Sequence, residues 1–147
     1  MSVLVRRLGV GDVALAHATF RLMAEVFEEG TGALSDAWVS RLLQSPAFFA
    51  LVALEGDAPV GGITAHALPM TREEKTELFI YDLAVRADRQ RLGIGRALVD
   101  ELRVAGAREG ITVSFVPADD EDVHALDFYR ALGGDPAPVT IFTFDDA

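Results

Sequence analysis

Residues Arg89–Leu98 read RQRLGIGRAL and form the most informative part of this chain. They follow an apolar, strand-like segment at residues 78–85 and lead into an amphipathic helix, expected from about Ile94 to just before Gly110. Glycines let the backbone approach an anion closely, and the first N–H groups of a helix have no intrahelical acceptor. The positive end of the helix dipole adds to this, so the stretch predicts a pyrophosphate site. A loop glycine with surface arginines is the alternative interpretation.

Composition indicates one globular domain over residues 1–147, because half of the residues (50%) are hydrophobic and can form a core. The 13 basic and 23 acidic residues give a net charge of −10, which disfavours nucleic acid and anionic membranes and favours cationic partners. Solubility alone also explains an acidic chain. With no cysteine and three histidines outside any metal-ligand spacing, we expect no disulfide, no thiol nucleophile and no metal. No stretch resembles a signal peptide or a membrane span, so a cytoplasmic protein is expected.

The apolar periodicity predicts an α/β fold in the order β-α-α-β-β-β-α-β-α-β. The helices are expected near residues 12–27 (with Asp12 as N-cap), 35–43 (capped by Ser35), 94–109 and 123–132. The strands are expected at residues 3–8, 48–54, 59–68, 78–85, 111–116 and 139–144.

Two motifs resemble those of the GNAT acetyltransferase superfamily. Gln90-x-x-Gly93-x-Gly95 after a strand is similar to its acetyl-coenzyme A signature, Q/R-x-x-G-x-G/A. Residues 125–133, ALDFYRALG, are similar to its late helix, which carries an aromatic-Tyr pair before Leu-Gly. The two motifs come in the family's order. The resemblance therefore implies the GNAT fold, a mixed central sheet of about six to seven strands flanked by about four helices, and acetyl-coenzyme A as co-substrate.

The resemblance also implies roles for individual residues. Backbone groups on the strand would bind the pantetheine arm, and the following loop would bind the pyrophosphate. Tyr129 would donate a proton to the leaving thiolate, although an aromatic ring packed beside Phe128 is the alternative. The superfamily often has Asn where this chain has Asp122, which puts a pantetheine contact there in doubt. The cofactor residues implied are Leu83, Ala84, Val85, Gln90, Arg91, Leu92, Gly93, Ile94, Gly95 and Arg96.

Asp82 interrupts an otherwise apolar strand. A carboxylate in such a strand is costly unless it is paired or faces a cleft. It is well placed, just before the residues implied in thioester binding, to take a proton from a bound ammonium. An aspartate on the solvent face of a half-exposed strand is the alternative.

Three further segments resemble the aminoglycoside 3-N-acetyltransferases of the gentamicin-resistance type: Tyr81–Val85, the acidic run 118–122 and the closing residues 142–145. An aminoglycoside carries several ammonium groups and needs carboxylates to replace their hydration. A solvated acidic loop is the alternative for the run itself. The drug-binding residues implied are Tyr81, Asp82, Asp119, Asp120 and Asp122.

The sequence thus predicts an enzyme that moves acetyl from acetyl-coenzyme A directly to an amino group of an aminoglycoside, with the 3-amino group expected, and that confers resistance. Its partner would be a small polycationic amine, and the sequence is compatible with a homodimer without determining the oligomeric state. One alternative is acetylation of another small amine or of a peptide or protein amine. A non-catalytic acyl-coenzyme A binding module is an alternative from another class.

Overall fold

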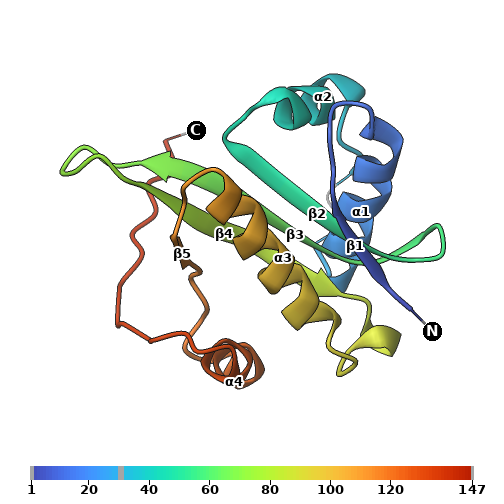
Figure 1. The fold of residues 1–147 in the computed structure, drawn as a ribbon. Helices are drawn as coiled ribbons and strands as arrows, with labels where there is room; N and C mark the ends of the chain where they lie inside the picture. Colours follow the sequence, from blue (N-terminus) through green and yellow to red (C-terminus); the bar gives the residue numbers. More distant parts are fainter. Residues whose placement is uncertain (1, 30–31, 147) are drawn as a thin grey trace. The chain divides into compact units, whose positions relative to one another are not determined.

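The structure, a computed structural model, describes residues 2–29 and 32–146 (Figure 1). It divides into two compact units, which we call the sheet unit (residues 1–117) and the C-terminal unit (residues 118–147). The single domain over residues 1–147 stays a prediction. None of the helices in the described part of the chain is long and apolar enough to cross a bilayer.

The sheet unit contains one mixed sheet in the order β1-β2-β3-β4-β5. Neighbouring strands are antiparallel except β4 and β5, which are parallel. Its elements are β1 (Leu4–Arg7), α1 (Val13–Val26), α2 (Asp36–Gln44), β2 (Phe48–Glu55), β3 (Ala58–Pro69), β4 (Thr76–Val85), the short 3-10 helix η1 (Ala87–Arg89), α3 (Ile94–Arg108) and β5 (Val113–Phe115).

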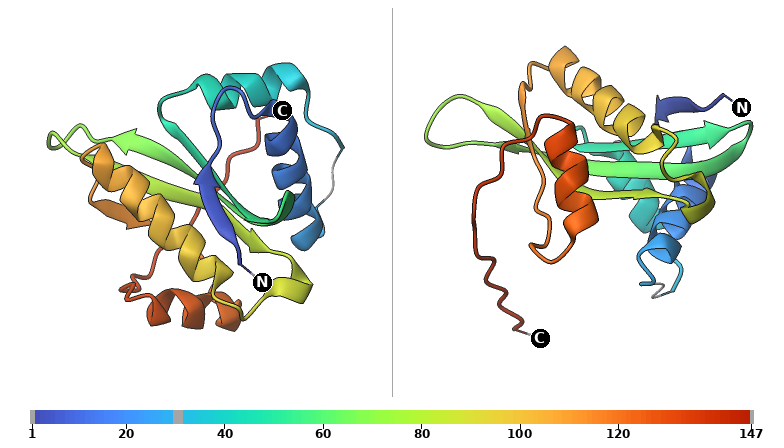
Figure 2. Two further views of the ribbon diagram at one scale, coloured as in Figure 1. Left: turned by 45° about the vertical axis from the view of Figure 1, so that its right-hand side comes forward. Right: turned by 90° about the horizontal axis from the view of Figure 1, so that it is seen from below.

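Helices cover both faces of this sheet, with α3 on one face and α1 and α2 on the other (Figure 2). Gly61 and Gly62 of β3 make the close approach possible on both faces. A Cβ at Gly62 would lie 2.7 Å from Thr19 of α1, and one at Gly61 would lie 3.3 Å from Leu98 of α3. Because successive strand residues point to opposite faces, each glycine admits one helix. We call these faces the α1 face and the α3 face.

The apolar core follows from this arrangement. On the α1 face, buried residues of β2 pack with those of the two helices, including Ala16, Val39 and Phe48. On the other face, Leu98 and Leu102 of α3 are fully buried. Ser35 caps α2 as predicted, accepting a hydrogen bond from the N–H of Trp38 at 3.1 Å.

Asp12 occupies the N-cap position of α1 as predicted, but its side chain does not cap the helix. The carboxylate instead accepts the N–H of Gly9 at 2.7 Å and pairs with Arg6 at 3.0 Å. These two bonds lower the pKa of Asp12. A basic neighbour on β1 thus outcompetes the helix for this side chain.

The C-terminal unit contains the last helix, α4 (Val123–Ala131), close to its predicted bounds. Asp122 caps it by accepting the N–H of Ala125 at 3.1 Å. The predicted strand at residues 139–144 is wrong: no strand is described there, and the sheet has five strands among the described residues instead of six to seven. The predicted four helices are present in the same residues, counting α1 to α4.

The apolar alternation at residues 139–144 does not make a strand because it lacks the neighbours a strand needs. Val139 and Ile141 would lie on one face and Phe142 and Phe144 on the other, so both faces would need a cover. All four side chains are exposed, between 71% and 86%. A strand also needs an adjacent strand whose backbone groups accept and donate its hydrogen bonds. An apolar pattern in the sequence does not provide that adjacent strand.

Substitutions in the core and substitutions at residues 139–144 should therefore differ sharply in their effect on the free energy of unfolding. Leu98→Ala removes a fully buried side chain and should lower the free energy of unfolding by about 2–5 kcal/mol. The double variant Phe142→Ser/Phe144→Ser changes exposed rings and should stay within ~0.5 kcal/mol per site. Urea unfolding measures both. A loss in the double variant as large as that of Leu98→Ala would show that residues 139–144 are covered in solution.

Candidate functional site

A bulge in β4 brings Tyr81 and Asp82 to the same face of the sheet. Thr64 of β3 is paired with Asp82, but the next residue, Ala65, is paired with Ile80, which leaves Tyr81 as the extra residue. Thr64 lies on the α1 face, two residues from Gly62, so its partner Asp82 lies there too. Without the bulge, two consecutive residues would point to opposite faces.

The side chain of Tyr81 is oriented by contacts with two neighbouring rings. Its ring centroid lies 6.0 Å from that of His66 on β3 and 5.9 Å from that of Phe79 on β4. Phe48 extends this row on one side of His66, at 5.2 Å, and Phe115 of β5 extends it beyond Phe79, at 4.9 Å. Tyr81 itself is 64% exposed. The bulge therefore presents an exposed aromatic ring beside a carboxylate.

Asp82 is half-buried, and within residues 2–29 and 32–146 no hydrogen bond to its carboxylate is described. Burial raises the pKa of Asp82, and the negative charge of Glu29, just beyond α1, raises it further. A carboxyl group with a raised pKa is a stronger base once it is ionised. This environment suits proton abstraction.

The edge of β4 that faces β5 is largely open. β5 is paired only with Glu77–Phe79, while β4 continues to Val85. Along residues 80–85, the sheet unit as described thus provides a strand neighbour on the β3 side only. Leu83, Ala84 and Val85, which the sequence predicts to bind the pantetheine arm, lie on this open stretch. Backbone donors and acceptors there are suited to an extended ligand.

The loop between β4 and α3 is bent by two left-handed residues. Arg91 has φ +65° and Gly93 has φ +82°. Glycine adopts this conformation readily, whereas Arg91 does so at a cost and marks a constrained turn. The first hydrogen bond of α3 runs from the Ala97 N–H to the Gly93 carbonyl at 3.0 Å, so the N–H groups of Ile94 and Gly95 precede it. These N–H groups lack an intrahelical acceptor, as an anion site requires, and the anion site itself stays a prediction.

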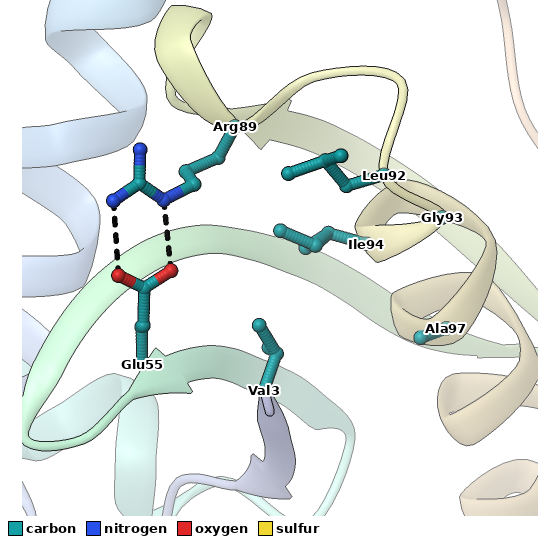
Figure 3. A pocket seen from close by; sticks show the side chains of 7 residues that line it. All are labelled: Val3, Glu55, Arg89, Leu92, Gly93, Ile94 and Ala97. Atoms are coloured by element: carbon teal, nitrogen blue, oxygen red, sulfur yellow. Dashed lines mark hydrogen bonds and ion pairs between the residues drawn. The ribbon is translucent and has the colours of Figure 1, made fainter. Parts of the chain in front are cut away.

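The side chains of this loop take different roles. Gln90, predicted to bind the cofactor, donates its side-chain amide to the Val85 carbonyl at 3.0 Å and ties the loop to the end of β4. Arg91 and Arg96 are exposed, and Leu92 is 67% exposed. Arg89 forms a two-pronged ion pair with Glu55 at the end of β2 (Figure 3).

A pocket of about 420 Å³ lies beside that ion pair (Figure 3). It is on the β1–β2 side of the loop, away from the open edge of β4. Its lining residues are Val3, Glu55, Arg89, Leu92, Gly93, Ile94 and Ala97.

The remaining predicted site residues belong to the C-terminal unit and are described within it. Tyr129 on α4 is half-buried, and its ring lies 5.1 Å from that of Phe128 in an edge-to-face arrangement. Asp119, Asp120 and Asp122 are exposed. Asp122 also caps α4, so its carboxylate has a structural role that the sequence analysis did not assign. Their part in a site stays a prediction.

Sequence reasoning missed three residues beside the site. His66, one of the three histidines outside any metal-ligand spacing, was not assigned to the site, but its ring contacts that of Tyr81. The alternation of β3 places His66 on the face of Thr64, which was a usable signal once the bulge was known. Glu29 and Glu55 gave no signal, because their neighbours Asp82 and Arg89 are distant in sequence. The described residues contain no group of His, Asp or Glu that could hold a metal ion.

Comparison with known proteins gives a consistent result. The family model described as acetyltransferase (GNAT) family matches residues 16–133. A search of curated proteins finds no match.

Among solved structures, the chain is similar to the aminoglycoside acetyltransferase HMB0005 from an uncultured soil metagenomic sample. The identity is 37%, both chains are covered over 100%, and the TM-score is 0.95. It is also similar to the aminoglycoside acetyltransferase meta-AAC0020 from an uncultured soil metagenomic sample, in complex with sisomicin, at 32% identity and TM-score 0.92, covering 97% of this chain and 95% of that one. The aminoglycoside N-acetyltransferase AAC(6')-Iy in complex with CoA, at 13% identity and TM-score 0.81 over 99% and 96% of the chains, shares the fold.

The raised pKa of Asp82 predicts a pH-dependent stability. The folded protein holds this proton more tightly than the unfolded chain does, so ionisation lowers the free energy of unfolding as the pH rises above ~4. Asp82→Asn removes that penalty. Its Tm should exceed that of the wild type at pH 8, and the difference should shrink toward pH 4. Asp100→Asn, at an exposed carboxylate of α3, is the matched control and should shift Tm little. A less stable Asp82→Asn variant at pH 8 would mean that the charge is compensated.

Proposed function

Because this chain belongs to the acetyltransferase (GNAT) family, we propose that it transfers acetyl from acetyl-coenzyme A to an amino group of an aminoglycoside, with the 3-amino group as acceptor. Likeness along the whole chain to an aminoglycoside acetyltransferase carries this proposal. The described geometry supports it with an open β4 edge, an anion-binding loop and a half-buried carboxylate on one unit. Acetylation removes one positive charge from the drug, so the enzyme would confer resistance.

In this proposal, the co-substrate lies along β4 and ends at the loop. Backbone groups of Leu83 and Val85 bind the pantetheine arm and polarise the thioester carbonyl, which preorganised N–H groups do well. The N–H groups at the start of α3 receive the pyrophosphate. The exposed side chains of Arg91 and Arg96 add charge-assisted contacts.

Asp82 acts as the general base. An aminoglycoside amine is largely an ammonium ion at neutral pH and must lose a proton before its nitrogen can attack. Asp82 accepts that proton, directly or through water, and its raised pKa favours the transfer. The nitrogen then forms a bond to the thioester carbon, the C–S bond breaks, and the electron pair leaves on sulfur. The nitrogen, positively charged after the attack, releases its second proton to water and becomes the neutral amide. The transfer is direct, since the chain has no cysteine to form an acetyl-enzyme.

Tyr129 acts as the general acid and gives its phenolic proton to the leaving thiolate. Support comes from its matched position in the late-helix motif. Action in the cytoplasm and as a homodimer remain predictions.

The acidic residues provide the drug's counter-charges. Tyr81 and Asp82 share the α1 face, and an exposed ring beside a carboxylate suits the apolar face and the ammonium groups of an amino sugar. Asp119, Asp120 and Asp122 supply further carboxylates from the C-terminal unit. Of these, Asp119 and Asp120 are better candidates for variants, because Asp122 also caps α4.

Thiol release from acetyl-coenzyme A should be fastest with an aminoglycoside such as sisomicin, and slower with polyamines and basic peptides. Mass spectrometry should find one added acetyl group, and NMR should place it at the 3-amino position. The same drug with its 3-amino group blocked is the control and should not react. Acetylation of the blocked drug would contradict the position, and turnover of peptides alone would contradict the substrate class. No thiol release with any amine would indicate a binding module.

Asp82→Asn and Tyr129→Phe should each lower kcat by ~100-fold or more, because a positioned acid or base typically contributes that much. Calorimetry should show acetyl-coenzyme A affinity largely retained in both. Asp119→Asn/Asp120→Asn should instead raise KM for the drug, and added salt should mimic it, since ~0.1 M salt screens exposed charges beyond about 10 Å. An unchanged kcat in Tyr129→Phe, with chemistry rate-limiting, would leave Tyr129 a packing residue.

A further inference from the structure

We propose that Glu55 is a positioning residue for the pyrophosphate loop: by holding Arg89, it fixes the backbone of residues 91–96 in the shape that receives the anion. This inference rests on the proposed function, because it assumes that the anion is the pyrophosphate of acetyl-coenzyme A. Glu55 lies at the end of β2, outside the motif and 34 residues before Arg89 in sequence.

The contact between the two side chains is specific. Nε of Arg89 donates to one carboxylate oxygen of Glu55 at 2.8 Å, and an Nη donates to the other at 3.0 Å (Figure 3). Such two-pronged pairs fix orientation as well as distance. Both side chains are shielded, at 27% exposed for Arg89 and 13% for Glu55. The neighbouring guanidinium lowers the pKa of Glu55, which therefore carries its charge at neutral pH.

The ion pair holds the chain directly before the residues that shape the loop. Arg89 ends η1, and the two left-handed residues that shape the loop, Arg91 and Gly93, follow within four positions. On the β4 side, Gln90 already ties the loop to the Val85 carbonyl. On the other side, the 420 Å³ pocket separates the loop from β1 and β2, and the side chains of Leu92 and Ile94 border it without filling it (Figure 3). The ion pair spans the rim of that pocket.

Arg89 is also distinct from the other arginines of the run. Its third nitrogen donates to the Asp88 carboxylate at 3.1 Å, so every nitrogen of the guanidinium already has an acceptor. A phosphate would have to displace a carboxylate to bind it. Arg89 is therefore assigned a structural role, whereas the side chains of Arg91 and Arg96 are exposed.

A positioning role and a purely electrostatic role for Glu55 predict opposite effects of Glu55→Gln on acetyl-coenzyme A affinity. The substitution removes a negative charge near an anion site and leaves Arg89 in excess. If only charge mattered, acetyl-coenzyme A would bind more tightly. If Glu55 positions the loop, the loop loosens and binding weakens.

The test measures the Kd of acetyl-coenzyme A by calorimetry for the wild type, Glu55→Gln and Arg89→Lys. Arg89→Lys keeps the charge but cannot form the two-pronged bond, so it stands in if Glu55→Gln fails to fold. We expect Kd to rise about tenfold in both, with KM for acetyl-coenzyme A rising more than kcat falls. Glu109→Gln is the matched control: it breaks the 3.0 Å pair with Arg7 at the far end of α3 and should leave Kd unchanged.

Amide hydrogen exchange of residues 90–97, without any ligand, gives a readout independent of activity. It should be faster in Glu55→Gln and unchanged in Glu109→Gln. Unchanged exchange, or an unchanged or lower Kd in the folded Glu55 variant, would overturn the inference. Failure of the wild type to bind acetyl-coenzyme A would instead overturn the proposed function and the assignment of the anion, while the exchange rates would still decide whether Glu55 fixes the loop.

Discussion

The bulge at Tyr81 is the feature on which the proposed chemistry depends. A regular β4 would send either Tyr81 or Asp82 to the α3 face, where α3 covers the sheet. The extra residue keeps both on the α1 face, and the ring of His66 on β3 fixes the direction of Tyr81. Asp82 is half-buried in this placement, and burial together with the negative charge of Glu29 raises its pKa.

The second constraint is the length mismatch between β4 and β5. β4 has ten residues and β5 has three, so β5 pairs only with Glu77–Phe79 and the pairing ends well before the loop. Along residues 80–85, the described sheet unit places no β5 partner on the backbone groups that a longer β5 would have used, although the Val85 carbonyl accepts the side-chain amide of Gln90. In the proposed function, the same strand provides a ligand-binding edge and a catalytic face, and its continuation through η1 leads directly to the start of α3. One rigid sheet can hold a long co-substrate along its whole length in this way.

The glycines of β3 support both features from within the core. Gly62 lets α1 approach the sheet closely, and Gly61 does the same for α3. A Cβ at Gly62 would clash with Thr19 and Met23 of α1, and one at Gly61 would crowd the Ala84 carbonyl and Leu98 of α3. Close packing of α1 also keeps Glu29, just beyond this helix, near Asp82. Close packing at the two glycines therefore contributes to the environment that raises the pKa of Asp82.

The amino-acid sequence by itself determined most of the elements, the Ser35 cap of α2, the glycine-containing motif before α3 and the identity of Asp82 as an unusual strand carboxylate. These depend on local periodicity and on short-range rules, which a sequence carries directly. Only the tertiary structure decided the bulge, the Glu55–Arg89 pair and the unpaired state of residues 139–144. Each depends on which strands or side chains far apart in sequence become neighbours. Local patterns do not encode that choice, because register and pairing are set by the packing of the whole sheet.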